Sequence, residues 1–111
     1  FDQVNFRELH MSFGGGMAVQ RAVADKWKKV TGCVLIEGFG MTESSPVATM
    51  NPVNMPDYNG SIGLPAPSTE LSVQDDDGRL LAQGEVGELC IRGPQVMRGY
   101  WQRPEETAKV L

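Results

Sequence analysis

A hydroxyl and a carboxylate follow a glycine-rich stretch in the first half of the chain. Residues 34–43 read Val-Leu-Ile-Glu-Gly-Phe-Gly-Met-Thr-Glu, so an apolar run stops at two glycines around Phe39 and leads into Thr42 and Glu43. Glycine lets a planar ligand approach the backbone, and an aromatic ring can stack on a base. The Thr42 hydroxyl can contact a phosphate oxygen, and Glu43 offers the oxygen ligand that Mg²⁺ prefers. This order predicts a strand that ends at a ligand.

The same residues also fit a strand that ends in a tight turn with a solvated Glu43, and the residues alone leave both interpretations open. A second run, Gly14-Gly15-Gly16, can cradle a phosphate or an aromatic ring between a strand and a helix. It does not complete the dinucleotide-binding pattern Gly-x-Gly-x-x-Gly, because Val19 occupies the position of the last glycine. It also lacks the Gly-Lys-Ser/Thr of a phosphate loop. Taken alone, this run favours a structural turn.

The predicted elements bring the two glycine runs together. Alternating residues predict a strand over 8–13, and 33–37 predict a second strand that is buried on both faces. Between them, a helix over 17–31, closed by Gly32, is predicted by one apolar stripe: Val19, Ala22, Val23, Trp27 and Val30. Such a β-α-β unit has parallel strands, so both glycine runs lie at strand carboxyl ends, where open α/β sheets bind ligands.

The pattern changes in the second half of the chain. Residues 41–63 carry prolines and asparagines without regular periodicity, which predicts a long functional loop with a short helix after Thr42. Further on, alternating segments such as 87–92, with a turn at 75–78, predict antiparallel strands, and Pro104 predicts the start of a helix.

We therefore expect an α/β fold, in which a β-α-β piece of a larger, mostly parallel sheet is followed by a small antiparallel β subdomain. The first part carries the loop of the ligand site. The expected domains are 1–62 and 63–111.

Composition excludes several functional classes. The 111 residues are 41% hydrophobic and 22% charged with a net charge of −4, which is ordinary for a globular protein. The basic cluster Lys26, Lys28 and Lys29 falls at a predicted helix C-terminus, where positive charge is favourable, so nucleic-acid binding has no electrostatic support. Cys33 and Cys90 lie in apolar runs and are expected to be buried thiols. No apolar run is long enough to span a bilayer.

Other reactive or aromatic side chains are interpreted as structural. We expect His10 to pack within its strand, and Tyr100 and Trp101 to anchor a core. Ser44 and Ser45 lack the Gly-x-Ser-x-Gly context of an activated nucleophile. None of these residues is therefore a candidate for chemistry.

Three segments in order resemble the motifs of acyl-adenylate-forming, AMP-binding enzymes. Gly14 to Ala18 resembles their glycine-rich adenine-side motif, and Gly38 to Glu43 resembles their aromatic-Gly-x-Thr-Glu motif. Gly87 to Trp101 resembles their Gly-Glu-Leu…Gly…Gly-Tyr motif. Three stretches look in particular like bacterial long-chain-fatty-acid–CoA ligases: 14–27, 60–65 and 93–107.

The resemblance implies a two-step reaction. ATP and a fatty acid give an acyl-adenylate and pyrophosphate, and the thiol of coenzyme A then displaces AMP. Thr42, contacting the α-phosphate, and Glu43, holding Mg²⁺, are the candidate catalytic residues. Phe39 lies on one face of the adenine, where the family more often has tyrosine. The implied cofactor-binding residues are Gly15, Gly16 and Met17 beside the adenine, Gly38 and Gly40 at the acyl tunnel, and Phe39, Met41 and Thr42.

Several parts of the family's machinery are not found in these residues: the Ser/Thr/Gly-rich phosphate loop, the ribose-binding Asp, the hinge and the C-terminal lysine. We therefore expect an internal segment that is inactive alone and associates with its own copies through raw sheet edges. Another acid–CoA ligase, an amino-acid adenylation domain or a non-catalytic nucleotide-binding module remains an alternative. The parent is expected to be cytoplasmic, with at most peripheral membrane contact.

Overall fold

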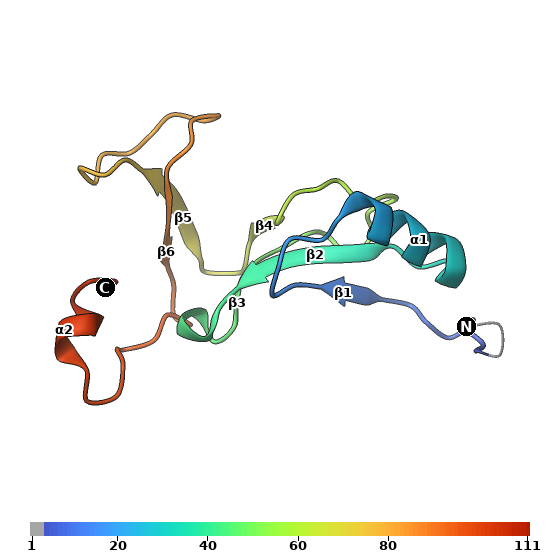
Figure 1. Cartoon of the computed structure of the whole chain (residues 1–111), viewed down its shortest axis with the longest axis horizontal. Coiled ribbons are helices and arrows are strands. Elements are labelled where there is room, and N and C mark those ends of the chain that lie inside the picture. The colour runs from blue at the N-terminus through green and yellow to red at the C-terminus, as the bar shows by residue number, and fades with distance from the viewer. Residues whose placement is uncertain (1–3) are drawn as a thin grey trace.

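Strand β2 (Leu35–Gly40) is the centre of the first sheet. The computed structural model describes residues 4–111. β2 pairs in parallel with β1 (Ser12–Gly14) and antiparallel with β3 (Val47–Met50), and β3 pairs with the short β4 (Leu64–Pro65), which gives the order β1-β2-β3-β4 (Figure 1). Helix α1 (Arg21–Thr31) connects β1 to β2. The predicted β-α-β unit is confirmed, within a mixed sheet.

The elements begin and end at other residues than the patterns predict. Of the strand expected over 8–13, only Ser12 and Phe13 pair, within β1, which ends at Gly14. Helix α1 begins at Arg21, because the backbone of its N-cap Gln20 is extended. β2 continues past Glu37 through its two glycines. The reason is β3, which lies in the stretch expected to be a loop and supplies the pairing partners.

The apolar stripe of α1 is not its buried face. Ala24 is 2% exposed, whereas Val23 and Val30 are 54% and 41% exposed. The Trp27 indole donates a hydrogen bond to Ser12 Oγ at 3.0 Å and so ties α1 to β1. Within residues 4–111, α1 contacts β2 and, through Arg21 and Lys28, the loop at 56–58. The predicted cap is confirmed, since Gly32 has φ of 75°.

The second sheet is a two-stranded antiparallel ribbon. It is formed by β5 (Glu70–Gln74) and β6 (Glu88–Arg92). The predicted turn at 75–78 is confirmed by a hydrogen bond from Gly78 N–H to the Asp75 carbonyl at 2.9 Å. Helix α2 (Pro104–Thr107) begins at the predicted proline and is only four residues long. The change of sheet falls between β4 and β5, and the domain division at residue 62 stays a prediction.

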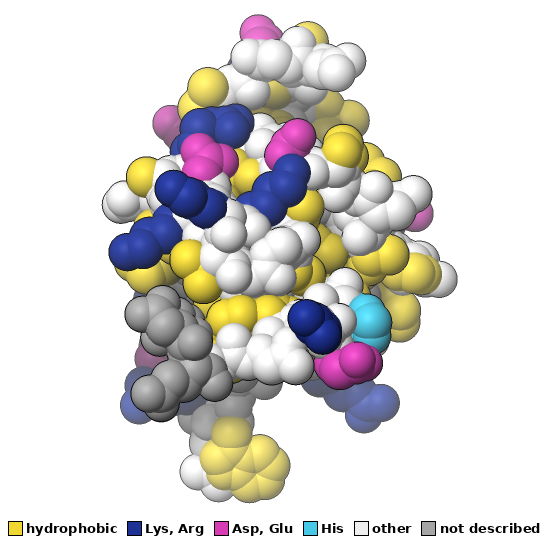
Figure 2. Space-filling model, turned by 90° about the vertical axis from the view of Figure 1, so that its right-hand side faces the viewer, with side chains coloured by type: hydrophobic (Ala, Val, Ile, Leu, Met, Phe, Trp, Pro, Cys, Tyr) yellow, Lys and Arg dark blue, Asp and Glu magenta, His cyan; other side chains and the backbone are white. Residues whose placement is uncertain are grey.

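The molecule is elongated and has little core. Its radius of gyration is 17.1 Å, against about 13 Å for a compact chain of this length. The buried hydrophobic residues among 4–111 are Ala24, Ile36 and Ala48. Figure 2 accordingly shows hydrophobic side chains at the surface around α1. No helix in the described range is long and apolar enough to cross a bilayer.

Several residues expected in a core are exposed for this reason. Trp101 is 86% exposed, so its interpretation as a core anchor is wrong. The His10 side chain is 83% exposed and lies outside β1, where it faces only Glu8, so it is not packed either. Cys33 and Cys90 are free and only half-buried.

Candidate functional site

The two glycine runs lie side by side, as predicted. Gly14 is opposite Glu37 in the parallel register of β1 and β2. A Cβ added to Gly15 would lie 3.4 Å from the carbonyl oxygen of Gly38. Both runs, together with Phe39, line a cavity of about 270 Å³. This is slightly below the roughly 300–1,000 Å³ of small-molecule pockets, which fits one part of a larger site.

The glycines of β2 also have a purely structural cause. A Cβ on Gly38 would lie 2.9 Å from the Thr49 carbonyl oxygen, and a Cβ on Gly40 would lie 1.7 Å from that of Pro46. β3 therefore passes too close to β2 for any side chain at these two positions. Both interpretations are supported, because these glycines lie against β3 and also line the cavity, together with Val47, Thr49 and Met50 of β3.

A buried carboxylate holds the segment that follows the first glycine run. Glu37 is 5% exposed, and its Oε1 accepts a hydrogen bond from Val19 N–H at 2.8 Å. The Tyr58 hydroxyl donates to the carbonyl of the same Val19. Asn51 donates from Nδ2 to the Glu37 carbonyl at 3.0 Å and so attaches the following loop to β2. The path of Gly14–Ala18 is thus fixed at Val19, just before the N-cap of α1.

Sequence reasoning missed this support around Val19. The one available signal was an acidic residue inside an apolar strand, at Glu37. Burial raises the pKa of the Tyr58 phenol above its ordinary value, and the Glu37 carboxylate raises it further. The guanidinium carbon of Arg21 lies 5.4 Å from the centre of the Tyr58 ring, and its positive charge partly lowers the pKa of this phenol.

The turn after β2 presents Thr42 and Glu43 from a short 3₁₀ helix, η1 (Thr42–Ser44), which confirms the predicted helix. Thr42 is exposed. The Ser44 hydroxyl is buried, accepts from Met41 N–H at 3.1 Å and donates to the Pro46 carbonyl at 2.7 Å. Ser44 therefore shapes the turn and is not available as a nucleophile.

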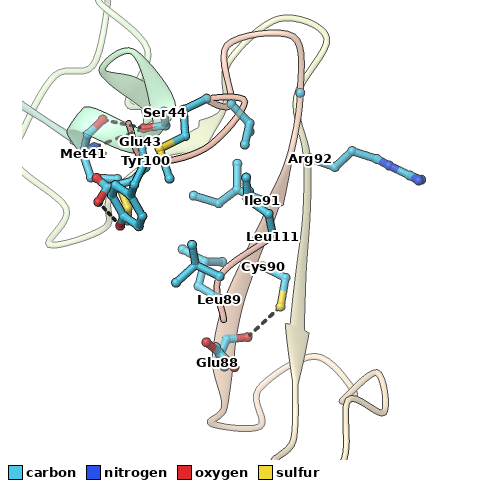
Figure 3. Close-up of a pocket in the computed structure, with 14 residues that line it drawn as sticks. Met41, Glu43, Ser44, Glu88, Leu89, Cys90, Ile91, Arg92, Tyr100 and Leu111 are labelled. Atoms are coloured by element: carbon cyan, nitrogen blue, oxygen red, sulfur yellow. Dashed lines mark hydrogen bonds between the residues drawn. The ribbon is translucent and has the colours of Figure 1, made fainter. Parts of the chain in front are cut away.

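Glu43 is held from the other end of the chain. The Tyr100 hydroxyl donates to Glu43 Oε1 at 2.6 Å, and Met97 N–H donates to the Glu43 carbonyl at 2.8 Å (Figure 3). The hydrogen bond from Tyr100 holds the pKa of the Glu43 carboxyl below its ordinary value, so this group is ionised at neutral pH. The expectation that Tyr100 anchors a core is wrong, because it is 37% exposed and contacts the candidate carboxylate.

A second cavity of about 580 Å³ separates this turn from β6. Leu89 and Ile91 point into it, whereas Arg92 points away (Figure 3). Glu43 and Met41 line this second cavity and not the first. The predicted site residues are therefore divided. Around the first cavity lie Gly15, Gly16, Gly38, Phe39 and Gly40; at the second lie Met41 and Glu43; and Met17 and Thr42 line neither.

The donor set at Glu43 fits a cation that arrives with a nucleotide. Residues 4–111 contain no cluster of three or more His, Cys, Asp or Glu side chains that could hold a metal alone. Mg²⁺ is usually bound by one or two protein carboxylates together with substrate phosphates. Tyr100 occupies Oε1 of Glu43, and no other residue among 4–111 donates a hydrogen bond to Oε2. One oxygen is therefore free for such a cation.

Comparison with known proteins identifies the family. Residues 2–101 match the AMP-binding enzyme family. The chain belongs to this family. Over all 111 residues it is 55% identical to the long-chain-fatty-acid–CoA ligase of Yersinia pestis and 53% identical to that of Salmonella typhimurium, covering 100% of this chain and 20% of each relative. It thus spans about a fifth of the length of these curated relatives.

A solved structure supports the fold of this AMP-binding segment. ATP-bound MatB from Rhodopseudomonas palustris matches with a TM-score of 0.79 and 31% sequence identity. The match covers 87% of this chain and 19% of that one. The α/β fold class expected from the sequence is confirmed, with a helix on a mixed sheet followed by a small antiparallel ribbon.

Proposed function

We propose that the chain is an internal segment of an ATP-dependent fatty acid–CoA ligase and supplies part of its adenylate site. The observation that carries the proposal is the contact between the two glycine runs beside Phe39, with the Thr42-Glu43 turn directly after them. These residues belong to two motifs that resemble the adenylate-binding motifs of the family. The identity of 55% to a long-chain-fatty-acid–CoA ligase supports a fatty acid as the substrate.

The proposed roles follow from the resemblance of these residues to the family's motifs. The backbone of Gly15, Gly16 and Met17 lies along one face of the adenine, and the Phe39 ring stacks on the other. The exposed Thr42 hydroxyl contacts the α-phosphate. The ionised Glu43 is the ligand for Mg²⁺, which when bound offsets the charge of the phosphates.

The proposed reaction has two steps at this site. The fatty-acid carboxylate attacks the α-phosphorus of ATP, and pyrophosphate leaves. The thiol of coenzyme A then attacks the acyl carbon, and AMP leaves. Placement of the two reactants and electrostatic stabilisation of the phosphates provide the rate enhancement, because none of the proposed residues forms a covalent bond to substrate.

Gly38 and Gly40 are proposed to border the acyl chain, and Met41 to contact the adenylate from the turn that follows. Met41 is 42% exposed and lines the cavity beside Glu43, so it is open to a ligand. The cytoplasmic location of the parent, with at most peripheral membrane contact, stays a prediction from the resemblance.

The test is fatty-acid-dependent exchange between ATP and pyrophosphate. We expect exchange from the protein encoded by the complete reading frame when a long-chain fatty acid is supplied. We expect none from the 111-residue chain, because the phosphate loop and the lysine of the family are not among these residues. Exchange that depends on another acid or on an amino acid would overturn the fatty-acid assignment, and fatty-acid-dependent exchange by the isolated chain would overturn its partial role.

A further inference from the structure

The segment after β6 crosses from the second sheet to the turn that carries Glu43. Gln95 donates from Nε2 to Thr69 Oγ1 at 2.7 Å and to the Val47 carbonyl at 3.3 Å, so it contacts β3 of the first sheet and the residue just before β5 of the second. Two residues later, the chain reaches Glu43 through the Met97 N–H. Tyr100 completes the crossing with its hydroxyl on Glu43 Oε1. Glu43 and Tyr100 are 57 residues apart in sequence, and their hydrogen bond brings two of the motifs together at one carboxylate.

Tyr100 is itself fixed by α2. Its N–H donates to Thr107 Oγ1 at 2.9 Å, and the Thr107 hydroxyl donates to the Arg103 carbonyl at 2.8 Å. Gly99 makes this approach possible, because a Cβ there would lie 2.8 Å from Thr107 Cγ2, and its φ of 147° is disfavoured for other residues. A continuous set of contacts therefore leads from Thr107 through Tyr100 to Glu43.

From this geometry we infer that Tyr100 is a positioning residue, which fixes Glu43 so that its second oxygen faces a divalent cation carried by a nucleotide. The inference deepens the proposed function and rests on it. With Oε1 held by Tyr100, the carboxylate does not have to be ordered when the cation binds. Hydrogen-bond partners of metal-binding carboxylates typically change metal affinity by about 10- to 100-fold when they are removed.

A purely structural role for Tyr100 makes a different prediction. If its hydroxyl only held the crossing segment in place, its loss would change stability and leave cation binding unaltered. The discriminating measurement is therefore cation affinity in the presence of nucleotide. Mn²⁺ is a suitable probe, because it takes the same oxygen ligands as Mg²⁺ and its binding can be followed by electron paramagnetic resonance.

The experiment titrates Mn²⁺ against the full-length protein in the presence of ATP. Tyr100→Phe keeps the ring and removes the hydroxyl, and we expect about tenfold weaker Mn²⁺ binding. Thr107→Val removes the acceptor for Tyr100 N–H at nearly constant shape and should weaken Mn²⁺ binding as well. Thr107→Ser keeps the hydroxyl and should bind Mn²⁺ as the unaltered protein does. Trp101→Phe is the matched control, because Trp101 is the exposed neighbour. In a Glu43→Ala background, Tyr100→Phe should cause no further loss.

The outcomes separate the inference from the proposed function. Equal Mn²⁺ affinity for Tyr100→Phe and Trp101→Phe overturns the inference, even in an active ligase. An additive effect of Tyr100→Phe on top of Glu43→Ala also overturns it. If the protein shows no fatty-acid-dependent exchange but Tyr100→Phe still weakens Mn²⁺ binding with ATP, the ligase proposal fails and the role of Tyr100 is supported. Absence of Mn²⁺ binding with ATP in the unaltered protein overturns both.

Discussion

Val19 has both backbone polar groups held by side chains from other elements. Glu37 accepts its N–H from β2, and Tyr58 donates to its carbonyl from the loop before β4. The sequence pointed to Glu43 as the carboxylate with a role, because it follows a glycine turn. It did not point to Glu37, since the need for a buried acceptor arises only when α1 packs beside β2. The order of neighbouring residues thus predicts the groups that face a ligand better than it predicts the distant side chains that hold the backbone in place.

Replacement of Glu37 tests how far this support matters. Glu37→Ala leaves the half-buried Val19 N–H without its acceptor, and the loss of an acceptor costs up to about 1–3 kcal/mol. Glu37→Gln keeps an acceptor oxygen, so its loss of stability should be clearly smaller than that of Glu37→Ala. The measurement is the midpoint of urea unfolding for both variants. Equal midpoints for the Ala and Gln variants would show that the hydrogen bond to Val19 is not what Glu37 contributes.

The raised pKa of Tyr58 predicts a loss of stability at alkaline pH. In the unfolded chain a tyrosine ionises near pH 10, and in the fold its pKa is higher. Its contribution to stability is therefore complete below about pH 10 and is lost as the pH rises through the folded value. The urea midpoint should fall over this range. The fall should be smaller in Tyr58→Phe, in which only Tyr100 still contributes, since its hydrogen bond to Glu43 raises the pKa of its phenol as well. Parallel curves for the two proteins would contradict this assignment.

At the scale of elements, β3 is the strand that the sequence did not predict. Its residues Val47–Met50 stand between prolines, and Ala48 and Thr49 are both buried, so the strand shows no alternation. Its partner β2 was predicted, but as ending at Glu37. Glycine was interpreted as a signal for the end of a strand, whereas here it allows two strands to lie close together. The helix and its cap were predicted because their signals are local.

Substitution of the glycines distinguishes those that allow close packing of two strands from those that only form a turn after a strand. Gly40→Ala would place a methyl group on the Pro46 carbonyl, and overpacking of this kind costs about 1–3 kcal/mol or more. Gly15→Ala is the control, because its Cβ would lie at ordinary contact distance from the Gly38 carbonyl. We expect a large fall of the urea midpoint for Gly40→Ala and little change for Gly15→Ala. A large effect of Gly15→Ala would mean that the first run is as tightly packed as the second.

At the scale of the whole molecule, the two sheets are joined by the short connection before β5 and by the contacts of Gln95, Met97 and Tyr100. The sequence predicted a β-α-β piece of a mostly parallel sheet followed by a small antiparallel subdomain. It could not predict their mutual placement, which depends on hydrogen bonds between distant residues. The lack of a large core follows from this arrangement, because neither sheet packs face to face on the other in Figure 1.

The exposed apolar surface predicts that the isolated chain associates with its own copies. Met17 is 82% exposed and Leu80 is 74% exposed, and β1 and β4 leave open edges on the first sheet. Burial of such surface against a second copy is favourable by about 25 cal/mol per Å², so association should increase with concentration. Static light scattering over a dilution series should show an average mass that rises above 12.1 kDa. The full-length protein provides the control, because its additional residues are proposed to cover these surfaces. A constant mass of one chain at every concentration would show that the open sheet edges and exposed side chains are tolerated in water.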